Sequence, residues 1–480
     1  MVLVLNFDDE ASRAVTRKLR SEKVYCKIVP GDISLEDIQA QEPLGLLLAG
    51  GTSGQCPVRL DYRIPQSGIP VLGLGDAAVM LLSRLGGTAG ETVFQGAVIG
   101  LTYKPSPLLS GIEDGERMLS CAKELHLSPQ TVPLCYAQEI IVGFAHESRP
   151  VYGMQFQVEQ NDPDGSMMLR NFALNICGCT TWWDEDAFIT RAQEEISRVV
   201  GQGRAVCALT GGLASGVSAL LAHKALGRNL KCVFVDTGLL REREGDDFIA
   251  FFRDTVGMDI TRVYAQDRFL EALRGIVKPE EKRRAIGRLL HTILQEEQEK
   301  LGDFDVVIRG TSCTDLMFSK GQEIPALTGK GSSVEPVREL FHDEIRRIAD
   351  FLGIPAELTG RQPFPGSGLA LRIMGEATPE RVRTLRAADA VFRSELQRSS
   401  AAKKLWQYFA VLWPMPGDEK NVMICLRAVY SSERTQAYAA RLPYDVMENV
   451  VELILRDQKN VCRVVYDLSP SSNYSGIEWQ

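Results

Sequence analysis

Residues 208–221 read ALTGGLASGVSALL, and this stretch decides the fold of the central part of the chain. An apolar, β-compatible segment at 204–209 leads into Gly211 and Gly212, and apolar residues follow at helical spacing over 217–224. Glycine lets a backbone approach an anion closely, and the first amides of the next helix point donors and a positive dipole end at it. A phosphate or pyrophosphate group is therefore the expected ligand of this turn.

The next predicted strand strengthens this interpretation. Residues 231–236 form an apolar run that ends at Asp236 and is followed by Thr237 and Gly238. Strand, glycine turn, helix and second strand in this order predict a parallel α/β unit with its ligand at the carboxyl ends of the strands. Ser215, at the start of the helix, would add a hydroxyl donor. A glycine pair alone, by contrast, is usually only a tight turn.

The composition is that of a soluble globular protein. The chain has 480 residues, of which 45% are hydrophobic and 24% charged, so we expect two or three domains. A net charge of −8 argues against broad binding to nucleic acid or to an anionic membrane. Acidic residues follow directly after a short apolar start at 1–7, and no apolar run is long enough to span a membrane. We therefore expect a cytoplasmic protein without a nucleic-acid or membrane partner.

The 11 cysteines are scattered along the chain, mostly within apolar segments, which predicts free buried thiols. Cys177 and Cys179 are close enough in sequence for a metal pair. No second cysteine or histidine pair has matching spacing, so a structural role is the preferred interpretation for both.

The first region, residues 1–180, has the pattern of a doubly wound α/β domain. VLVLNF at 2–7 and GLLLAGG at 45–51 read as short buried strands, with an amphipathic stretch between them. IPVLGLGDAAVMLLSRLGG at 69–87 reads as a strand, a sharp glycine turn and a helix, the geometry of a nucleophile elbow. VYGMQFQVE at 151–159 supplies a late strand.

This region resembles a class I glutamine amidotransferase domain, of the type fused to the front of GMP synthetase. That family has a cysteine in the elbow and a late strand that ends in His-Pro-Glu. Here Gly75 stands at the cysteine position and Gln157 at the histidine position, while Glu159 is retained. Glutamine hydrolysis by this route needs a thiolate and an imidazole, so we expect no glutaminase activity. Asp76 is expected to cap the following helix rather than to replace the nucleophile.

The second region, residues 181–361, resembles the ATP pyrophosphatase domain of GMP synthetase. That family's loop reads Ser-Gly-Gly-Val-Asp-Ser, and further ordered matches occur at 234–241, 266–270, 279–288 and 335–349. The resemblance implies a nucleotide-binding set made of Thr210, Gly211, Gly212, Leu213, Ala214, Ser215, Gly216, Val235, Asp236, Gly310 and Thr311.

The resemblance also implies a chemistry. In the family, ATP adenylates xanthosine monophosphate (XMP), pyrophosphate leaves, and ammonia displaces the adenylate to give GMP. The loop holds the pyrophosphate together with Mg²⁺, but here Ala214 replaces the loop aspartate. Asp236 and Asp315 are the remaining candidate metal ligands. The family's long lid is reduced to residues 331–334, GSSV.

The third region, residues 362–480, resembles the family's α+β C-terminal dimerisation domain, which implies a homodimer. Arg361, Ile477 and Glu478 match positions of its acceptor site. Ser471 stands where the family has a lysine for the nucleotide phosphate. An anion without that lysine would be held less tightly.

Three hypotheses remain open. The first is a GMP synthetase-like protein that binds purine nucleotide, ATP with XMP as candidate acceptor, but has lost catalysis. The second is a working ligase that uses free ammonia, ATP and Mg²⁺. The third is a scaffold in which Gly211 and Gly212 are only a turn. Turnover of ATP to AMP and pyrophosphate separates the first two.

Overall fold

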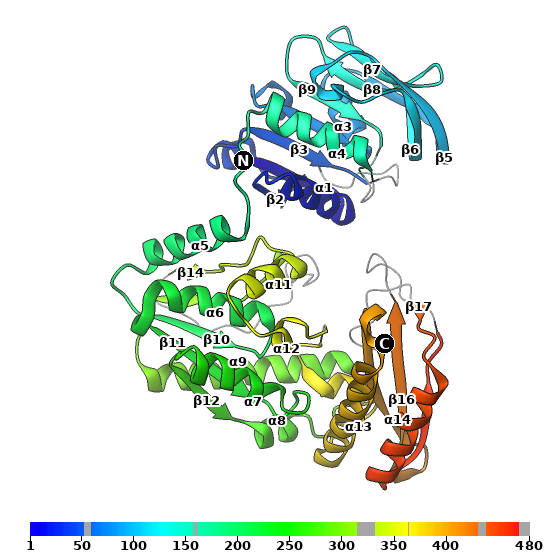
Figure 1. Cartoon of the computed structure of the whole chain (residues 1–480). Helices are drawn as coiled ribbons and strands as arrows, with labels where there is room; N and C mark the ends of the chain where they lie inside the picture. The colour runs from blue at the N-terminus through cyan, green and yellow to red at the C-terminus, as the bar shows by residue number, and fades with distance from the viewer. Residues whose placement is uncertain are drawn as a thin grey trace. The chain divides into compact units, whose positions relative to one another are not determined.

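The protein consists of two compact units, Met1–Phe188 and Ile189–Gln480, in a computed structural model (Figure 1). The structure describes residues 1–51, 59–156, 158, 162–313, 332–362, 364–430 and 438–469, without the side chains of residues 400 and 419. Helix α5 (Glu185–Val200) begins in the first unit and ends in the second.

The first unit is built on a nine-stranded mixed sheet in the order β2-β1-β3-β4-β9-β8-β7-β5-β6. Neighbouring strands from β2 to β9 pair in parallel, and those from β9 to β6 pair antiparallel. The strands are β1 (Val2–Asn6), β2 (Cys26–Pro30), β3 (Gly45–Ala49), β4 (Val71–Leu74), β5 (Thr88–Tyr103), β6 (Gly115–His126), β7 (Thr131–Ala137), β8 (Ile140–His146) and β9 (Val151–Met154).

Both faces of the parallel half are covered, as the continuous apolar runs predict. Along β1, Val2 and Val4 belong to one buried cluster, and Leu3 and Leu5 belong to another. Helices α1 (Asp9–Ser21) and α4 (Pro163–Arg170) contribute to the first cluster, and α2 (Leu35–Gln39) and α3 (Asp76–Arg84) to the second. The doubly wound α/β fold expected for this region is therefore confirmed. The short η1 (Ile64–Gln66), η2 (Pro107–Leu109) and η3 (Asn171–Ile176) complete the unit.

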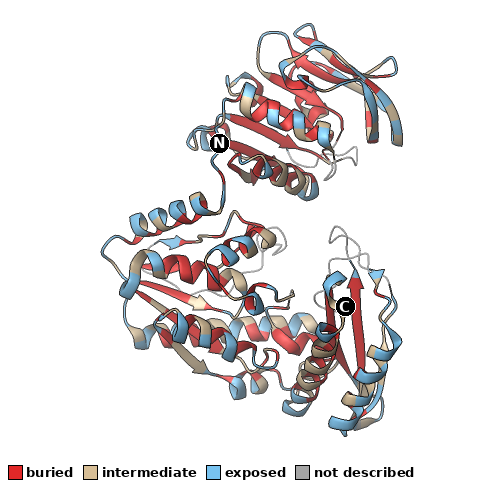
Figure 2. Cartoon of the chain, in the orientation of Figure 1, coloured by how far each residue is buried: buried red, intermediate tan, exposed pale blue. Residues whose placement is uncertain are grey.

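The long antiparallel pair β5 and β6 was not predicted from the sequence. Most residues of β5 are exposed or half-buried, and the more buried positions alternate with exposed ones only over its second half (Figure 2).

The second unit contains a five-stranded, fully parallel sheet in the order β12-β11-β10-β13-β14. Its strands are β10 (Ala205–Leu209), β11 (Leu230–Asp236), β12 (Ile260–Tyr264), β13 (Val306–Ile308) and β14 (Ser333–Val334). Its helices are α6 (Leu213–Leu226), η4 (Gly227–Asn229), α7 (Glu244–Ile249), η5 (Ala250–Thr255), α8 (Gln266–Ala272), α9 (Pro279–Leu301), α11 (His342–Phe351) and α12 (Ala356–Thr359). The predicted order of strand, glycine turn, helix and strand is present.

A second, four-stranded sheet lies in the same unit. Its strands pair antiparallel in the order β15-β16-β17, and β18 pairs in parallel with β16. The elements are η6 (Gly368–Arg372), α13 (Pro379–Arg398), η7 (Ser400–Lys404), β15 (Gln407–Met415), β16 (Asp418–Tyr430), β17 (Tyr438–Ala439), α14 (Tyr444–Asp457) and β18 (Val461–Tyr466). This is the α+β arrangement that the third region predicts.

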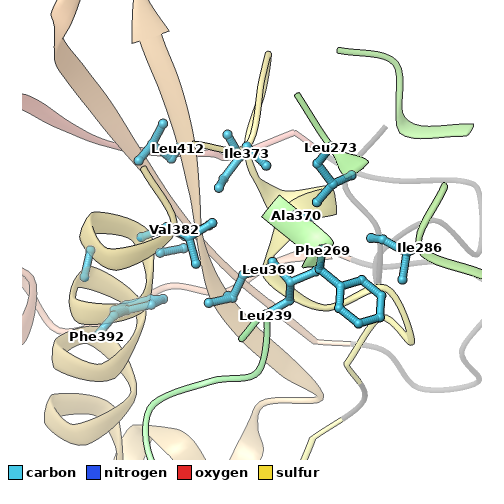
Figure 3. Packing of buried hydrophobic residues seen from close by; sticks show 14 of the residues in the cluster. Leu239, Phe269, Leu273, Ile286, Leu369, Ala370, Ile373, Val382, Phe392 and Leu412 are labelled. Carbon is cyan, nitrogen blue, oxygen red and sulfur yellow. The ribbon is translucent and has the colours of Figure 1, made fainter. Parts of the chain in front are cut away.

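One buried cluster joins the two sheets of the second unit. Figure 3 shows Leu239, from the loop after β11, beside Leu369 of η6, with Phe269 of α8 close by. The same cluster continues through Val382 and Phe392 of α13 to Leu412 of β15. The loop that follows β11 therefore packs against the C-terminal part of the chain.

Ten cysteines lie in the part of the chain that the structure describes, and none of the ten forms a disulfide. Burial raises the pKa of Cys135 to about 12 and that of Cys177 further. Within that part, no group of three or more His, Cys, Asp or Glu side chains could hold a metal ion. The search over those same residues also finds no helix with the length and apolar character to cross a membrane.

Candidate functional site

The 210–215 loop joins β10 to α6. Gly211 has a φ of +81°, a conformation open to glycine, and Gly212 precedes the first helical residue. The Ser215 hydroxyl donates to the Gly212 carbonyl at 2.9 Å, and the Thr210 amide donates to the Ser215 hydroxyl at 3.2 Å. These bonds fix the loop from within, so Ser215 holds the turn rather than projecting freely toward a ligand.

The outer side of this loop is little crowded by the residues that the structure describes. Among them, a Cβ added at Gly212 would meet only the Thr210 hydroxyl, at 3.4 Å, and one at Gly211 would have Leu240 at 3.6 Å as its nearest neighbour. The first hydrogen bond of α6 runs from the Gly216 amide to the Gly212 carbonyl. The earlier amides of the helix have no partner of the i→i−4 kind, so those of Leu213 and Ala214 are candidate donors to an anion, whereas Gly310 packs against the Ser215 amide nitrogen.

Gly310 meets the start of α6 from the end of β13. A Cβ there would lie 2.5 Å from the Ser215 Cα and 2.6 Å from its amide nitrogen, so only glycine permits this approach. Thr311 is buried, and its hydroxyl donates to Glu335 at 2.9 Å. The structure thus brings Gly310 to the predicted loop, while the Thr311 hydroxyl is engaged elsewhere.

Val235 and Gly216, both predicted to bind nucleotide, make packing contacts within the second unit. Val235 is 6% exposed and belongs to the hydrophobic core of the unit. A Cβ on Gly216 would lie 2.7 Å from the ring of Phe252. Gly216 therefore allows α6 to pack closely on that ring. Contact of either residue with a nucleotide stays a prediction. Such a contact would have to use backbone atoms, because the Val235 side chain is buried and Gly216 has none.

Asp236, at the end of β11, has both carboxylate oxygens engaged. Oδ1 accepts the Gly238 amide at 3.1 Å, and Oδ2 accepts from the Arg262 guanidinium at 2.5 Å. Arg262 comes from the neighbouring strand β12 and also donates to Asp246 at 2.7 Å. Ala214 supplies no carboxylate, and Asp315 lies outside the described residues. The sequence did not indicate Arg262, because only the parallel register brings it to Asp236.

Arg386 of α13 binds the loop that follows β11. Its Nε donates to the Leu240 carbonyl at 2.9 Å, and its terminal nitrogen donates to the Gly238 carbonyl. The Leu369 amide adds a bond to the Leu239 carbonyl at 2.8 Å. The C-terminal part of the chain therefore fixes one edge of the candidate site. No local signal in the sequence pointed to Arg386.

Next to this loop lies a buried cluster of charged side chains around Asp389. Arg241 and Arg372 approach its carboxylate at 3.7 and 3.8 Å, and both are almost fully buried. The Arg372 guanidinium lies 4.0 Å from the ring centroid of Phe409 and 5.1 Å from that of Phe364. Burial, and then the charge of Arg241, lower the pKa of Arg372. Asp389 is therefore a counter-charge for at least two buried cations.

Arg361, expected at the acceptor site, lies within the second unit against α7. Its guanidinium donates to the Glu244 carbonyl at 3.3 Å and lies 3.8 Å from the Glu244 carboxylate. Burial lowers its pKa, although Glu244 opposes this effect. Ile477, Glu478 and Ser471 lie outside the described residues, so the composition of an acceptor site stays a prediction.

The elbow of the first unit has a different environment. Gly75 has a φ of +57°, and its amide donates to the Met154 carbonyl of β9 at 2.9 Å. A Cβ at this position would lie 2.5 Å from the Gly51 carbonyl oxygen and 2.7 Å from that of Gly50. The Asp76 amide donates to the same Gly51 oxygen at 2.9 Å. The turn at 50–51 therefore fills the space in which a nucleophile and its oxyanion would stand.

The prediction that Asp76 caps this helix was wrong. Helix α3 begins at Asp76, and Gly75 occupies the N-cap position without a side-chain hydrogen bond. An N-cap carboxylate must precede the first helical residue. Asp76 instead carries a charge in the first turn, where it favours the helix dipole. Gln157 and Glu159 lie outside the described residues, so their roles stay predictions.

Comparisons with known proteins cover the whole chain. A family model of the GMP synthase C terminal domain matches residues 394–479. The chain is 37% identical over 511 residues to a GMP synthase (glutamine-hydrolyzing) of Caldicellulosiruptor saccharolyticus, with 100% of this chain and 99% of the relative covered. It is 36% identical over 508 residues to the enzyme of the same name from Clostridium perfringens, with the same coverage.

A solved structure also matches part of the chain. It is described as a putative GMP synthase subunit from Thermoplasma acidophilum, and it is 22% identical over 37% of this chain and 93% of its own length, with a TM-score of 0.31. At that TM-score the match supports no statement about function.

Proposed function

The chain belongs to the GMP synthase (glutamine-hydrolyzing) family, and we propose that it binds purine nucleotide at the 210–215 loop without hydrolysing glutamine. On this proposal, residues 1–180 form an inactive amidotransferase-like domain, residues 181–361 bind ATP, and residues 362–480 form a dimerisation domain. The protein would act in the cytoplasm as a nucleotide-binding homodimer.

The observation that supports nucleotide binding most directly is the open side of the 210–215 loop. Among the described residues, a Cβ on Gly212 would have only the Thr210 hydroxyl within 4 Å, and the first amides of α6 have no carbonyl partner four residues back. A helix start of this kind attracts phosphate groups through its amides and its dipole. The close approach of Gly310 to Ser215 fixes the position of these amides.

The elbow supports the loss of glutaminase activity. A glycine at position 75 cannot attack a substrate, and the Asp76 amide, which would belong to an oxyanion hole, already donates to the Gly51 carbonyl. An oxyanion placed there would meet a carbonyl oxygen instead of a donor. Two independent features therefore oppose acyl-enzyme chemistry.

Binding is tested by titrating the protein with ATP in a calorimeter and repeating the titration with Gly212→Leu. We expect the substitution to weaken ATP binding at least tenfold, because a side chain would fill the space above the amides. The unfolding midpoint should not change, because Gly212 has an ordinary φ of −84° and, within the described part of the chain, a Cβ there would contact only the Thr210 hydroxyl. Equal affinity in both proteins would favour the scaffold hypothesis, in which the glycines form only a turn.

A second candidate function is an ammonia-dependent ligase that aminates XMP through an adenylyl intermediate. Similarity over the full chain to GMP synthases (glutamine-hydrolyzing), at 36–37% identity, favours it. Incubation with ATP, XMP, Mg²⁺ and ammonium, with AMP, pyrophosphate and GMP followed separately, decides between the two. GMP formation would establish the ligase, whereas ATP binding without turnover would support the nucleotide-binding protein.

A further inference from the structure

Arg262 lies between two carboxylates at the carboxyl edge of the five-stranded sheet. One terminal nitrogen is 2.5 Å from the Asp236 Oδ2, and the other is 2.7 Å from the Asp246 Oδ1. The Arg262 and Asp236 side chains are only 18% and 20% exposed, so solvent screens this pair incompletely. The ring of Tyr264 lies 4.8 Å from the guanidinium carbon and restricts it further.

This arrangement occupies the one described carboxylate that the sequence assigns to the nucleotide site as a metal ligand. Oδ1 of Asp236 accepts the Gly238 amide, and Oδ2 accepts from Arg262. A guanidinium remains protonated throughout the physiological pH range, so it does not vacate the position by losing its charge. A divalent cation at Asp236 would stand close to that fixed positive charge and be repelled by it.

The neighbouring side chains do not restore a metal site. Mg²⁺ prefers oxygen ligands in near-octahedral geometry, usually including one or two carboxylates. Ala214 contributes no oxygen, and Arg386 brings a second guanidinium to the Gly238 carbonyl, two residues from Asp236. Over the residues that the structure describes, no group of three His, Cys, Asp or Glu side chains could hold an ion. These donors do not fit Mg²⁺ at the end of β11.

We infer that Arg262 keeps divalent cations off Asp236, so that this strand end contributes an ion pair to the nucleotide site and not a metal ligand. The inference rests on the proposed binding of nucleotide at the 210–215 loop, and it assigns Arg262 a specificity-determining role there. Removing Arg262 leaves two carboxylates, Asp236 and Asp246, without their shared cation. A divalent cation then has a place to bind.

The first experiment compares ATP affinity in Mg²⁺ with ATP affinity in EDTA by calorimetry. The ratio of ATP affinity in Mg²⁺ to ATP affinity in EDTA should be the same, within threefold, for the unmodified chain and for Asp236→Asn. Arg262→Met should raise the ratio at least tenfold, and the double variant R262M/D236N should lose that gain. The matched control is Arg268→Met, which breaks another arginine–carboxylate pair, between Arg268 of α8 and Glu296 of α9. It should leave the ratio unchanged.

Two results would overturn the inference. Either D236N alone lowers the Mg²⁺-to-EDTA ratio tenfold, which would show that Asp236 holds a metal, or R262M leaves the ratio as it was. If no ATP binds under any condition, the proposed function fails, and Mn²⁺ binding without nucleotide, measured by electron paramagnetic resonance, tests the inference separately. R262M should then bind Mn²⁺ at least tenfold more tightly than the unmodified chain and R268M, and equal affinities would contradict it.

Discussion

The elbow at Gly75 and the loop at Gly211 and Gly212 have the same local design and opposite surroundings. Each joins a buried parallel strand to a helix through a glycine with positive φ. At the elbow, the Gly51 carbonyl accepts the Asp76 amide and would lie 2.5 Å from any Cβ at position 75. At the 210–215 loop, the nearest obstacle to a Cβ on Gly211 is 3.6 Å away. The two turns therefore differ in what lies above the helix start, and on the proposed function this difference decides whether an anion can bind.

The largest expected effect concerns catalysis at the elbow, because it is all or none. The unmodified chain, Gly75→Cys and Gln157→His should each show no glutaminase activity, since thiolate and imidazole are both needed. Only the double variant G75C/Q157H could show any, and only if the turn at 50–51 moves away from the new side chain. Release of ammonia from glutamine measures it. Glutaminase activity in the unmodified chain would contradict the claim that the elbow is closed while the 210–215 loop is open.

The next effect concerns the buried charged cluster around Asp389, which lies next to the loop that follows β11. Asp389→Asn removes the charge that lies 3.7 to 3.8 Å from Arg241, Arg372 and Arg393. Breaking a buried pair in this way costs about 3–5 kcal/mol of unfolding free energy, because charges remain buried without a counter-charge. Urea unfolding measures the change. Asp457→Asn, whose partner Arg456 is exposed, should change stability by less than about 0.5 kcal/mol, and equal effects would contradict the role of Asp389.

A matched pair of alanine substitutions compares the two turns directly. Gly75→Ala should destabilise the protein by about 2 kcal/mol, because it combines a positive φ with a contact of 2.5 Å to a backbone oxygen. Gly212→Ala should stay within about 0.5 kcal/mol, since its φ is −84°. Thermal or urea unfolding followed separately for each unit measures both. Similar losses at the two positions would remove the distinction between them.

The last effect depends on pH and concerns the contact between α9 and η6. The buried Lys282 ammonium donates to the Ala370 carbonyl at 3.0 Å and to the Ile373 carbonyl at 2.7 Å. Burial lowers the pKa of Lys282 to about 8, below its ordinary value of 10.5. The unfolded chain therefore binds more protons between these two pH values, and this group's contribution to stability rises with pH across that window by up to about 1.4 kcal/mol per unit.

Urea unfolding at several pH values from 7 to about 10 tests this prediction. Lys282→Met should remove this part of the rise, whatever the substitution does to stability at neutral pH. An identical pH dependence in both proteins would show that Lys282 does not titrate in that window. The first unit has no part in this contact. The pH dependence of its unfolding should therefore be the same in Lys282→Met as in the unmodified chain.

Prediction from sequence succeeded where the signal is local. The apolar run of β10, the glycines at 211 and 212 and the helical spacing that follows lie within one short stretch, and the structure has each element in that order. Prediction failed where the partner is distant in sequence. Arg262 is 26 residues from Asp236, and Arg386 is 146 residues from the Leu240 carbonyl that it binds. Neither contact can be predicted from the spacing of residues along the sequence. The first depends on the register of β11 and β12, and the second depends on how α13 packs against the loop after β11.

By itself, the sequence determined the doubly wound first unit and the parallel sheet with its glycine loop, because the period of apolar residues encodes these features locally. The C-terminal α+β arrangement and the glycine in place of a thiol at position 75 followed from resemblance to a family. Only the tertiary structure decided that the Gly51 carbonyl closes the elbow and that Arg262 engages Asp236. Both depend on segments that come together in folding, where one carbonyl or one guanidinium changes what a helix start or a carboxylate can bind.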